Sequence, residues 1–249
     1  MSNLELRNNI VYLKSVDSTN DYANRLIKKK GADEGTVILA EFQNQGKGQR
    51  GNFWESEAGK NLTFSFILRP RSLPAQKQFY LSMAVSLGII RFFESEKIEA
   101  FIKWPNDIYV GRKKIAGILI ENSLNRDTID YSVIGIGLNV NQEKFLSDAP
   151  NPTSILLEKN IVSEPDNVLD KLLTVLELQL RQLYENKLEL LRDNYLRYLM
   201  LRGKLSTFIA GGCSFEGEII NVNEAGELVL QLKDGVKKSF GFKEIVFPY

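Results

Sequence analysis

Positive charge gathers in residues 103–120, which read KWPNDIYVGRKKIAGILI in a chain whose acids and bases otherwise nearly cancel. The charged side chains of this stretch are Lys103, Asp107, Arg112, Lys113 and Lys114. Apolar residues typical of a β-strand follow the lysines directly. A lysine held beside low-dielectric walls attracts a phosphate far more strongly than one in bulk water. The stretch therefore indicates an anion site at the end of a buried strand. A charged turn at the protein surface is an equally good interpretation of the same residues.

A glycine-rich loop offers a second set of groups suited to anions. Residues 46–51 read GKGQRG, and three glycines let backbone N–H groups approach a ligand beside two cations. The loop is not a Walker A motif, because that motif needs glycine where the chain has Glu41 and serine or threonine where it has Gly48. Two interpretations remain open: the loop binds an anion, or it only connects two strands.

Tryptophan and asparagine side chains lie close in the sequence to the cationic stretch and the glycine-rich loop, or follow an apolar run. The two tryptophans, Trp54 and Trp104, could each stack on a flat ring or wall an apolar pocket, and core packing is the alternative for either one. Residues 135–141, GIGLNVN, end an apolar run with amides that suit a nucleotide's sugar or phosphate. Asparagine after a strand is also common turn chemistry, so this pattern by itself leaves both roles open.

The composition excludes several kinds of site. A net charge of +1 gives no general attraction to nucleic acid or to anionic membranes, so anion recognition must be local. The single cysteine, Cys213, excludes intrachain disulfides and thiol–metal clusters, and the absence of histidine excludes Ser–His and Cys–His catalysis and histidine zinc sites. No signal pattern and no apolar run of about 18 residues occurs, so we expect a cytoplasmic protein that does not enter a membrane.

Helices and strands must position these groups. Residues 18–21 (STND) resemble a capping box, which predicts a helix through about residue 30 that ends at Gly31. A second helix is expected over 76–95, and 167–201 is strongly helical, as one or two helices. The expected strands are 36–43, 61–68, 100–104, 107–110, 114–121 and 131–141, with a turn at 111–112.

Several of these strands follow one another without an intervening helix, which favours an α+β fold with a mixed or antiparallel sheet and flanking helices over a doubly wound one. From Leu205 onward, Gly217, Gly226 and Gly235 punctuate short alternating strands, as in a small β-barrel. We therefore expect a larger domain over 1–202 and a small barrel domain over 203–249.

The order of the motifs along the chain is that of a known family. The matching pieces are Ser18-Thr19-Asn20, Gln43 with Gly46 to Gly51, Trp54, Lys103 to Asp107, Lys114 to Gly117, and Gly135 to Asn139. Together they resemble a biotin protein ligase, from about Leu13 to the small terminal barrel. The resemblance implies a class II synthetase-like catalytic domain and an SH3-like C-terminal barrel.

The resemblance also implies an activity. Biotin's carboxylate attacks the α-phosphorus of Mg-ATP to give biotinyl-adenylate and pyrophosphate, and a lysine of a biotin carboxyl carrier protein then displaces AMP. Biotin and ATP with Mg²⁺ are substrates, no tightly bound cofactor is expected, and the metal ligands are left unassigned. Positioning and charge screening would supply most of the acceleration, since two anions must meet.

Site residues carry over from the family by their positions in this chain. The catalytic residues would be Lys114 and Lys103. The biotin site would comprise Ser18, Thr19, Asn20, Gln43, Gly46, Lys47, Gly48, Gln49, Lys114 and Gly117. The ATP and adenylate site would comprise Arg50, Trp54, Lys103, Asn106, Asp107, Lys114 and Asn139.

Two residues depart from the family loop, which commonly reads Gly-Arg-Gly-Arg-x-Gly. Lys47 keeps the charge but loses the planar fork of arginine, and Gln49 loses the charge. The loop is therefore expected to retain the adenylate less tightly, with Arg50 as a candidate for compensation.

The resemblance bears on partners as well. The ligase pattern begins about a dozen residues from Met1, which predicts a ligase without a DNA-binding helix-turn-helix. Family members often form homodimers through the sheet and present a strand edge to the carrier domain. The alternatives are a lipoate–protein ligase, whose histidine-containing motif a chain without histidine cannot supply, and a non-catalytic binding module, against which the near-neutral charge argues.

Overall fold

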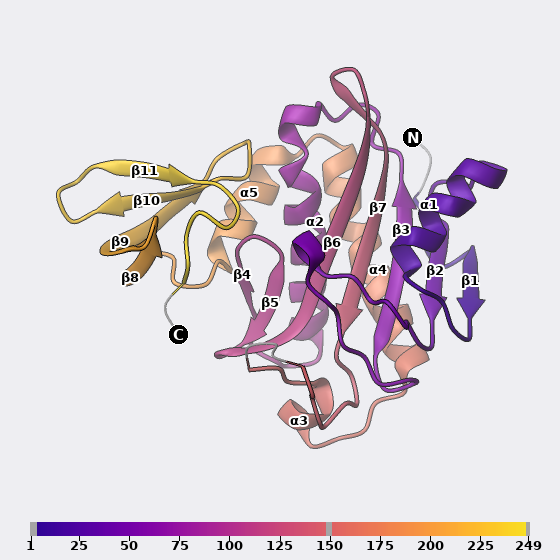
Figure 1. Cartoon of the computed structure of the whole chain (residues 1–249). Coiled ribbons are helices and arrows are strands. Elements are labelled where there is room, and N and C mark those ends of the chain that lie inside the picture. Colours follow the sequence, from indigo (N-terminus) through magenta and orange to yellow (C-terminus); the bar gives the residue numbers. More distant parts are fainter. Residues whose placement is uncertain (1–3, 148–150, 248–249) are drawn as a thin grey trace.

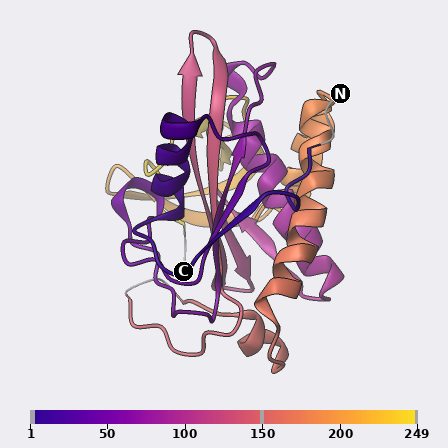
Figure 2. The same ribbon diagram turned by 90° about the vertical axis from the view of Figure 1, so that its right-hand side faces the viewer.

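A computed structural model describes residues 4–147 and 151–247, with the side chains of Lys30 and Arg50 outside the description. Its larger part is a three-layer arrangement built on a seven-stranded sheet (Figure 1). One helix lies on one face of this sheet and a group of helices covers the other (Figure 2). The sheet order is β1-β2-β3-β7-β6-β5-β4.

The strands combine parallel and antiparallel pairing. They are β1 Ile10–Leu13, β2 Val37–Ala40, β3 Leu62–Leu68, β4 Phe101–Lys103, β5 Asp107–Val110, β6 Lys113–Asn125 and β7 Thr128–Leu138. The pair β1–β2 is parallel and the other pairs are antiparallel, so the expected mixed sheet is confirmed. The edge strand β1 was not predicted from the sequence, because three half-buried residues and one exposed residue give no clear alternation.

Helix α1, Thr19–Lys30, lies over β2, β3 and β7 on the face that carries the glycine-rich loop (Figure 2). It ends at Gly31 in the left-handed region, as expected, with the Gly31 N–H donating to Ile27 O. The predicted capping box is wrong, because the Ser18 side chain makes no cap hydrogen bond. The Asp21 carboxylate pairs instead with Lys47 of the loop.

The opposite face buries most of the apolar core. Helix α2, Phe79–Ser95, packs there between the sheet and α4, Pro165–Tyr184. At Gly88 a Cβ atom would lie 2.6 Å from Leu176, so glycine permits the close approach of these two helices. The helical region 167–201 divides into α4 and α5, Leu188–Arg197, and the short α3, Ile155–Lys159, was not predicted. None of the described helices has the length and apolar character needed to cross a bilayer.

A second, four-stranded antiparallel sheet lies beside β4 and β5 (Figure 1). Its strands are β8 Leu205–Ala210, β9 Cys213–Val222, β10 Leu228–Leu232 and β11 Lys237–Phe240. Trp104 joins it to the larger part: its indole N–H donates to Gly226 O at 2.8 Å and its ring packs on Phe242 and Phe247. Trp104 therefore has the core-packing role, and the domain boundary near residues 202–203 stays a prediction.

Candidate active site

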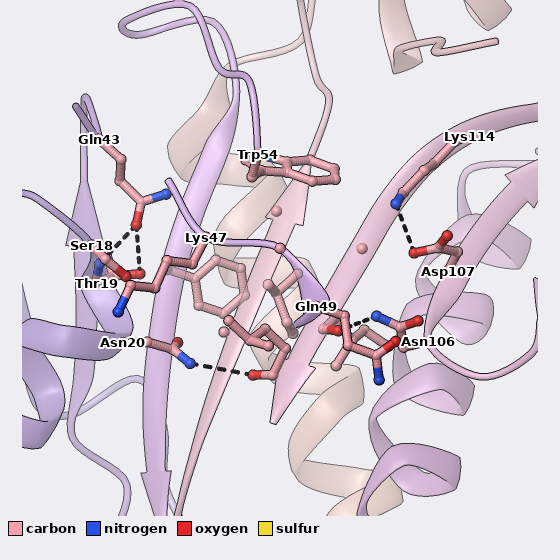
Figure 3. Close-up of a pocket in the computed structure, with 18 residues that line it drawn as sticks. Ser18, Thr19, Asn20, Gln43, Lys47, Gln49, Trp54, Asn106, Asp107 and Lys114 are labelled. Atoms are coloured by element: carbon pink, nitrogen blue, oxygen red, sulfur yellow. Dashed lines mark hydrogen bonds and ion pairs between the residues drawn. The ribbon is translucent and has the colours of Figure 1, made fainter. Parts of the chain in front are cut away.

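A pocket lies between the start of α1, the glycine-rich loop and the strands β6 and β7 (Figure 3). It brings together predicted site residues that are up to about a hundred positions apart in the sequence. Those in its lining are Ser18, Thr19, Asn20, Gln43, Lys47, Gly48, Gln49, Trp54, Asn106, Asp107, Lys114 and Gly117.

One end of the pocket is a hydrogen-bonding network of buried amides and hydroxyls. The Thr19 backbone N–H and hydroxyl both donate to Gln43 Oε1, at 2.7 and 3.1 Å. With its oxygen occupied in this way, the Gln43 amide has its Nε2 donors left for the cavity (Figure 3). This end of the pocket therefore suits a ligand carbonyl.

Asn20 is oriented by hydrogen-bond partners on two strands and by close contact with a third. Its Oδ1 accepts from the Ser65 hydroxyl of β3 at 2.6 Å, and its Nδ2 donates to Glu121 Oε2 of β6 at 3.0 Å. A Cβ atom at Gly135 of β7 would lie 2.3 Å from Asn20 Oδ1, so only glycine leaves room for this side chain. Buried polar groups that are paired in this way hold one geometry.

The other end of the pocket carries charge. Lys114 Nζ lies 2.7 Å from Asp107 Oδ1 and 5.5 Å from the centre of the Trp54 ring (Figure 3). Both charged side chains are mostly buried, at 22% and 21% exposure, so their charges are weakly screened by solvent. Asp107 is the only acid among the residues that line the pocket in the described part of the chain.

A β-bulge puts Lys114 on the correct side of the sheet. Lys114 and Gly117 are three residues apart, so a regular strand would place them on opposite faces. The register of β5 against β6 shifts between Ile108 and Tyr109, where Tyr109 pairs with Lys114 and Ile115 is left over. This extra residue lets Lys114 and Gly117 line the same pocket.

Glycines of β6 and β7 form a floor beneath Trp54. A Cβ atom at Gly137 would lie 2.2 Å from the indole ring, and one at Gly117 would lie 2.9 Å from it. The two glycines are paired across the strands, so they leave one continuous flat depression. The indole ring fills it, and its N–H has no hydrogen-bond partner among the described residues.

The glycine-rich loop closes over the pocket as a small hairpin. The Trp54 N–H donates to Gly46 O at 2.9 Å and the Gly48 N–H donates to Asn52 O at 2.7 Å. Lys47 Nζ lies 2.6 Å from Asp21 of α1, and this hydrogen bond raises the pKa of the lysine. Although residues 46–51 have the G-x-G-x-x-G spacing of a dinucleotide-binding loop, they contain only the three-residue 3-10 turn Gln49–Gly51, and no long helix opens there.

Four predicted site residues are not part of the lining. Gly46 holds the base of the loop, and the side chain of Arg50 lies outside the described residues. Asn139 follows the end of β7, where the chain turns away, and its Nδ2 donates to Thr153 O at 2.8 Å. Lys103 pairs with Asp107 across β4 and β5, which puts the two side chains on the same face of the sheet, and the Tyr109 and Phe247 rings lie beside its ammonium group.

Lys103 is electrostatically connected to the pocket. Its burial lowers its pKa to about 8, an effect that Asp107 opposes and that the positive charge of Lys114 reinforces. The pKa of Lys103 thus lies closer to neutrality than that of an ordinary lysine. Its assigned role stays a prediction.

The sequence did not predict the apolar part of the lining. It consists of Phe64, Ile118, Leu119 and Ile136. In a strand such residues are indistinguishable from core residues by their pattern alone. Gly135 and Gly137 also line the pocket without having been assigned to it, and their spacing of two, which puts both on one face of a strand, was the available signal.

The arrangement suits a ligand with an uncharged hydrogen-bonding head and an anionic tail. The polar end can bind the head, and Lys114 can bind the tail or a second anion beside it. No cluster of three or more histidine, cysteine, aspartate or glutamate residues occurs in the described parts of the chain. The pocket's own side chains can contribute charge and positioning to a reaction.

Comparisons with known proteins agree with this geometry. Residues 12–139 match the model of the biotin/lipoate A/B protein ligase family. The chain is 30% identical over 250 residues to the bifunctional ligase/repressor BirA of Escherichia coli, spanning 95% of this chain and 73% of that protein. It is 29% identical over 207 residues to the biotin–[acetyl-CoA-carboxylase] ligase of Mycobacterium tuberculosis, spanning 81% and 76% of the two chains.

Solved structures lead to the same group of proteins. The biotin protein ligase of Aquifex aeolicus in complex with biotin and ATP superposes with a TM-score of 0.80 at 26% identity, over 97% of this chain and 99% of that one. A biotin acetyl coenzyme A carboxylase synthetase from Helicobacter pylori has a TM-score of 0.58 at 23% identity, over 93% of this chain and 99% of that one, which supports the fold alone.

Proposed function

The chain belongs to the biotin/lipoate A/B protein ligase family, and we propose that this ligase joins biotin to a lysine of a biotin carboxyl carrier protein at the expense of ATP. The observation that carries the proposal is a single pocket with a network of amides and hydroxyls at one end and the Lys114–Asp107 pair at the other. Biotin has a ureido ring at one end and a carboxylate at the other, which matches this polarity.

The polar end favours biotin over lipoate. A ureido group has a carbonyl and two N–H groups, and the Gln43 amide and the Ser18 and Asn20 side chains offer donors and acceptors for them. The dithiolane ring of lipoate makes no such hydrogen bonds, so it would leave the Gln43 Nε2 donors without a ligand partner. A site built to pair polar groups rejects an analogue that lacks them.

In the first step, the biotin carboxylate oxygen bonds to the α-phosphorus of ATP while the bond to the pyrophosphate leaving group breaks. The two reacting groups are anions that repel one another. We place their meeting point beside Lys114, whose positive charge lowers this repulsion. Asp107 holds the ammonium group in place through a 2.7 Å contact.

In the second step, the amine of the carrier lysine forms an amide bond with the biotin carbonyl, AMP leaves with the bridging oxygen, and the amine loses a proton to solvent or to the phosphate. Trp54 and the loop would cover the adenylate between the two steps and exclude water, to which a mixed anhydride is sensitive. We assign Trp54, Asn106, Asp107 and Lys103 to the nucleotide side of the site.

Mg²⁺ enters with ATP as the metal–nucleotide substrate in this proposal. The described residues provide no cage of three or more metal-binding side chains, and Asp107 is already paired with Lys114. This donor set suits Mg²⁺, which binds substrate phosphates and waters together with one or two carboxylates. The cation screens the phosphate charge when it is bound.

We place the acceptor contact at the free edge of β6. The pairing of β5 with β6 ends at Gly117, so residues 119–125 of β6 have no strand partner on that side within the described chain. An extended segment of the carrier domain can add to such an edge. A cytoplasmic location also belongs to the proposal, since carrier, ATP and biotin must meet in one compartment. So does a homodimer, which the family resemblance implies.

Mass measurement of an apo carrier domain tests the function. The protein, Mg-ATP and the carrier are incubated with biotin or with lipoate, and pyrophosphate is measured in parallel. We expect biotin-dependent pyrophosphate release and a mass gain of one biotinyl group on one lysine. A lipoyl gain would favour the lipoate activity, and biotin binding without pyrophosphate would favour a binding module.

A further inference from the structure

A groove of about 800 Å³ separates the two sheets on the side of the molecule where β4 and β5 lie. Its walls come from four places: the start of β4, the turn between β5 and β6, the end of α5 with the segment that leads to β8, and strand β9. No role in the proposed reaction has been assigned to it.

The groove has fixed walls. The segment after α5 is bound to β4 on one side, where Ile102 N–H donates to Tyr198 O and Met200 N–H donates to Ile102 O, both at 2.8 Å. It is bound to β9 on the other side, where Gly203 N–H donates to Ile219 O at 3.1 Å. The groove is therefore a preformed feature of the fold.

The charge of the groove is strongly positive. Its charged side chains are Arg112, Arg197, Arg202, Lys204 and Glu218. None of the four cations forms an ion pair with another residue of the described chain, whereas the adjacent Lys113 pairs with Glu158. A net excess of positive charge in one groove, in a chain of net charge +1, is a local complement for an acidic partner.

One wall of the groove is continuous with a strand of the active site. Arg112 lies in the turn between β5 and β6, two residues before Lys114 at the start of β6. Phe101, Leu199 and Ile219 contribute apolar surface between the cations. Mixed apolar and basic lining suits a polypeptide with acidic and apolar side chains better than nucleic acid, which is bound through phosphate contacts and stacked aromatic rings.

We propose that this groove docks an acidic segment of the protein acceptor while its target lysine enters the pocket. The inference rests on the proposed function, because the acceptor is the one protein that must approach Lys114. It adds a second contact to the strand edge of β6, and both contacts lie on the β5 side of that strand. The groove would then act on acceptor binding and leave adenylate formation unaffected.

A double charge reversal tests the proposal. Arg202→Glu/Lys204→Glu changes two exposed side chains that lie outside the catalytic pocket. We expect the KM for the carrier domain to rise about 10-fold or more, with kcat and biotin-dependent pyrophosphate release unchanged, since rim charges act mainly on association. Wild-type KM should also rise with NaCl concentration, and that of the variant should rise less.

The matched control is Lys237→Glu/Lys238→Glu on β11, which makes the same change in net charge on exposed residues of the same small sheet. We expect it to keep the wild-type KM. An equal rise in both variants, or no rise in the groove variant, would overturn the proposal. Binding of a short DNA duplex that the groove variant abolishes, with acceptor KM unchanged, would overturn it in favour of nucleic acid.

Two further measurements keep the test decisive. If the reversal variant does not fold, Arg202→Gln/Lys204→Gln is measured in its place, and about a 3-fold rise in KM is expected for neutralised rim charges. A wild-type protein that releases no pyrophosphate with biotin refutes the proposed function itself. That outcome is distinguishable from normal pyrophosphate release with an unchanged carrier KM, which refutes only the groove.

Discussion

Lys114 is the residue on which the proposed chemistry depends most. Its ammonium group lies in a partly enclosed site, 2.7 Å from Asp107, in contact range of the Trp54 ring, and on the wall of the pocket that accepts both substrates in our proposal. A charge in such a site acts on a developing anion with little screening. Its neighbours on the same hairpin, Arg112 and Lys113, point to other surfaces.

Lys114→Ala should therefore abolish adenylate formation. Removal of one charge that stabilises the transition state costs about 100- to 1,000-fold in rate, so biotin-dependent pyrophosphate release should fall at least that far. The melting temperature should change little, and Lys113→Ala, whose side chain pairs with Glu158 outside the pocket, serves as the control. Near-normal adenylation by Lys114→Ala would refute its role.

Lys103 should make adenylation depend on pH. Its pKa of about 8 lies below its ordinary value of 10.5, so the folded protein loses this proton at a lower pH than an unfolded chain does. We expect the adenylation rate to fall as pH rises through about 8, because a cation near the phosphates is lost. Lys103→Arg, which stays charged, should lack this fall, and Lys103→Met should be slow at every pH.

The same shift affects stability in the opposite direction. Between pH 8 and 10.5 the unfolded chain binds more protons at Lys103 than the folded protein, so the free energy of unfolding rises with pH across this window. Denaturant titrations of wild type and Lys103→Met at several pH values separate this contribution from others. Identical pH dependence in the two proteins would show that the Lys103 pKa is not lowered.

Gln49 is the residue at which loop retention of the intermediate is expected to be weak. It lines the pocket without a charge, where the family commonly has an arginine. Gln49→Arg should slow escape of biotinyl-adenylate several-fold, because an arginine can hold a phosphate with two hydrogen bonds. Trapping of released adenylate measures this rate, with Gln49→Glu expected to accelerate release. Release from Gln49→Arg at the wild-type rate would contradict the expectation.

At the level of the elements, the site depends on irregular features of β6 and β7. The bulge opposite Ile108 and Tyr109 brings Lys114 to the face of Gly117, and the paired Gly117 and Gly137 form the floor below Trp54. Regular strands with larger side chains would be more stable as a sheet but would leave no pocket.

Gly137→Ala should disturb the site through Trp54. The new methyl group would lie 2.2 Å from the indole ring, so the ring must move, and overpacking of this kind costs about 1–3 kcal/mol. Adenylation should fall together with stability, as measured by chemical denaturation. Adding Trp54→Ala to this variant should restore part of the lost stability, and simple additivity of the two changes would argue against the clash.

At the level of the whole molecule, the two sheets are joined by Trp104. Its indole is 3% exposed, bonds to Gly226 in the turn between β9 and β10, and packs on Phe242 and Phe247 near the C-terminus. The hydrophobic core extends without a break from the seven-stranded sheet into the small one. The proposed groove lies along the same junction.

Trp104→Ala should loosen this junction. Loss of a buried tryptophan costs about 3–5 kcal/mol, so the free energy of unfolding should fall by that amount, and cleavage by proteases within residues 203–249 should become faster. Trp104→Phe keeps most of the packing and loses only the hydrogen bond, so it should cost about 1 kcal/mol. A Trp104→Ala variant as stable as wild type would show that the junction contributes little.

The sequence by itself determined the kinds of groups at the site and the long elements that carry them. Residue types such as Lys114, Trp54 and Gln43 identify the chemistry, and a helix such as α2 follows from periodicity over many residues, since both are local properties of the chain. The mixed sheet followed from the order of these elements.

Only the tertiary structure decided how these groups meet. It assigned Trp104 to the core and Trp54 to the pocket, paired Asp21 with Lys47 in place of a capping box, and left Asn139 outside the lining. It also placed the bulge before Gly117 and the groove between the sheets. Each of these depends on contacts between residues far apart in the sequence, which local propensity and spacing do not encode.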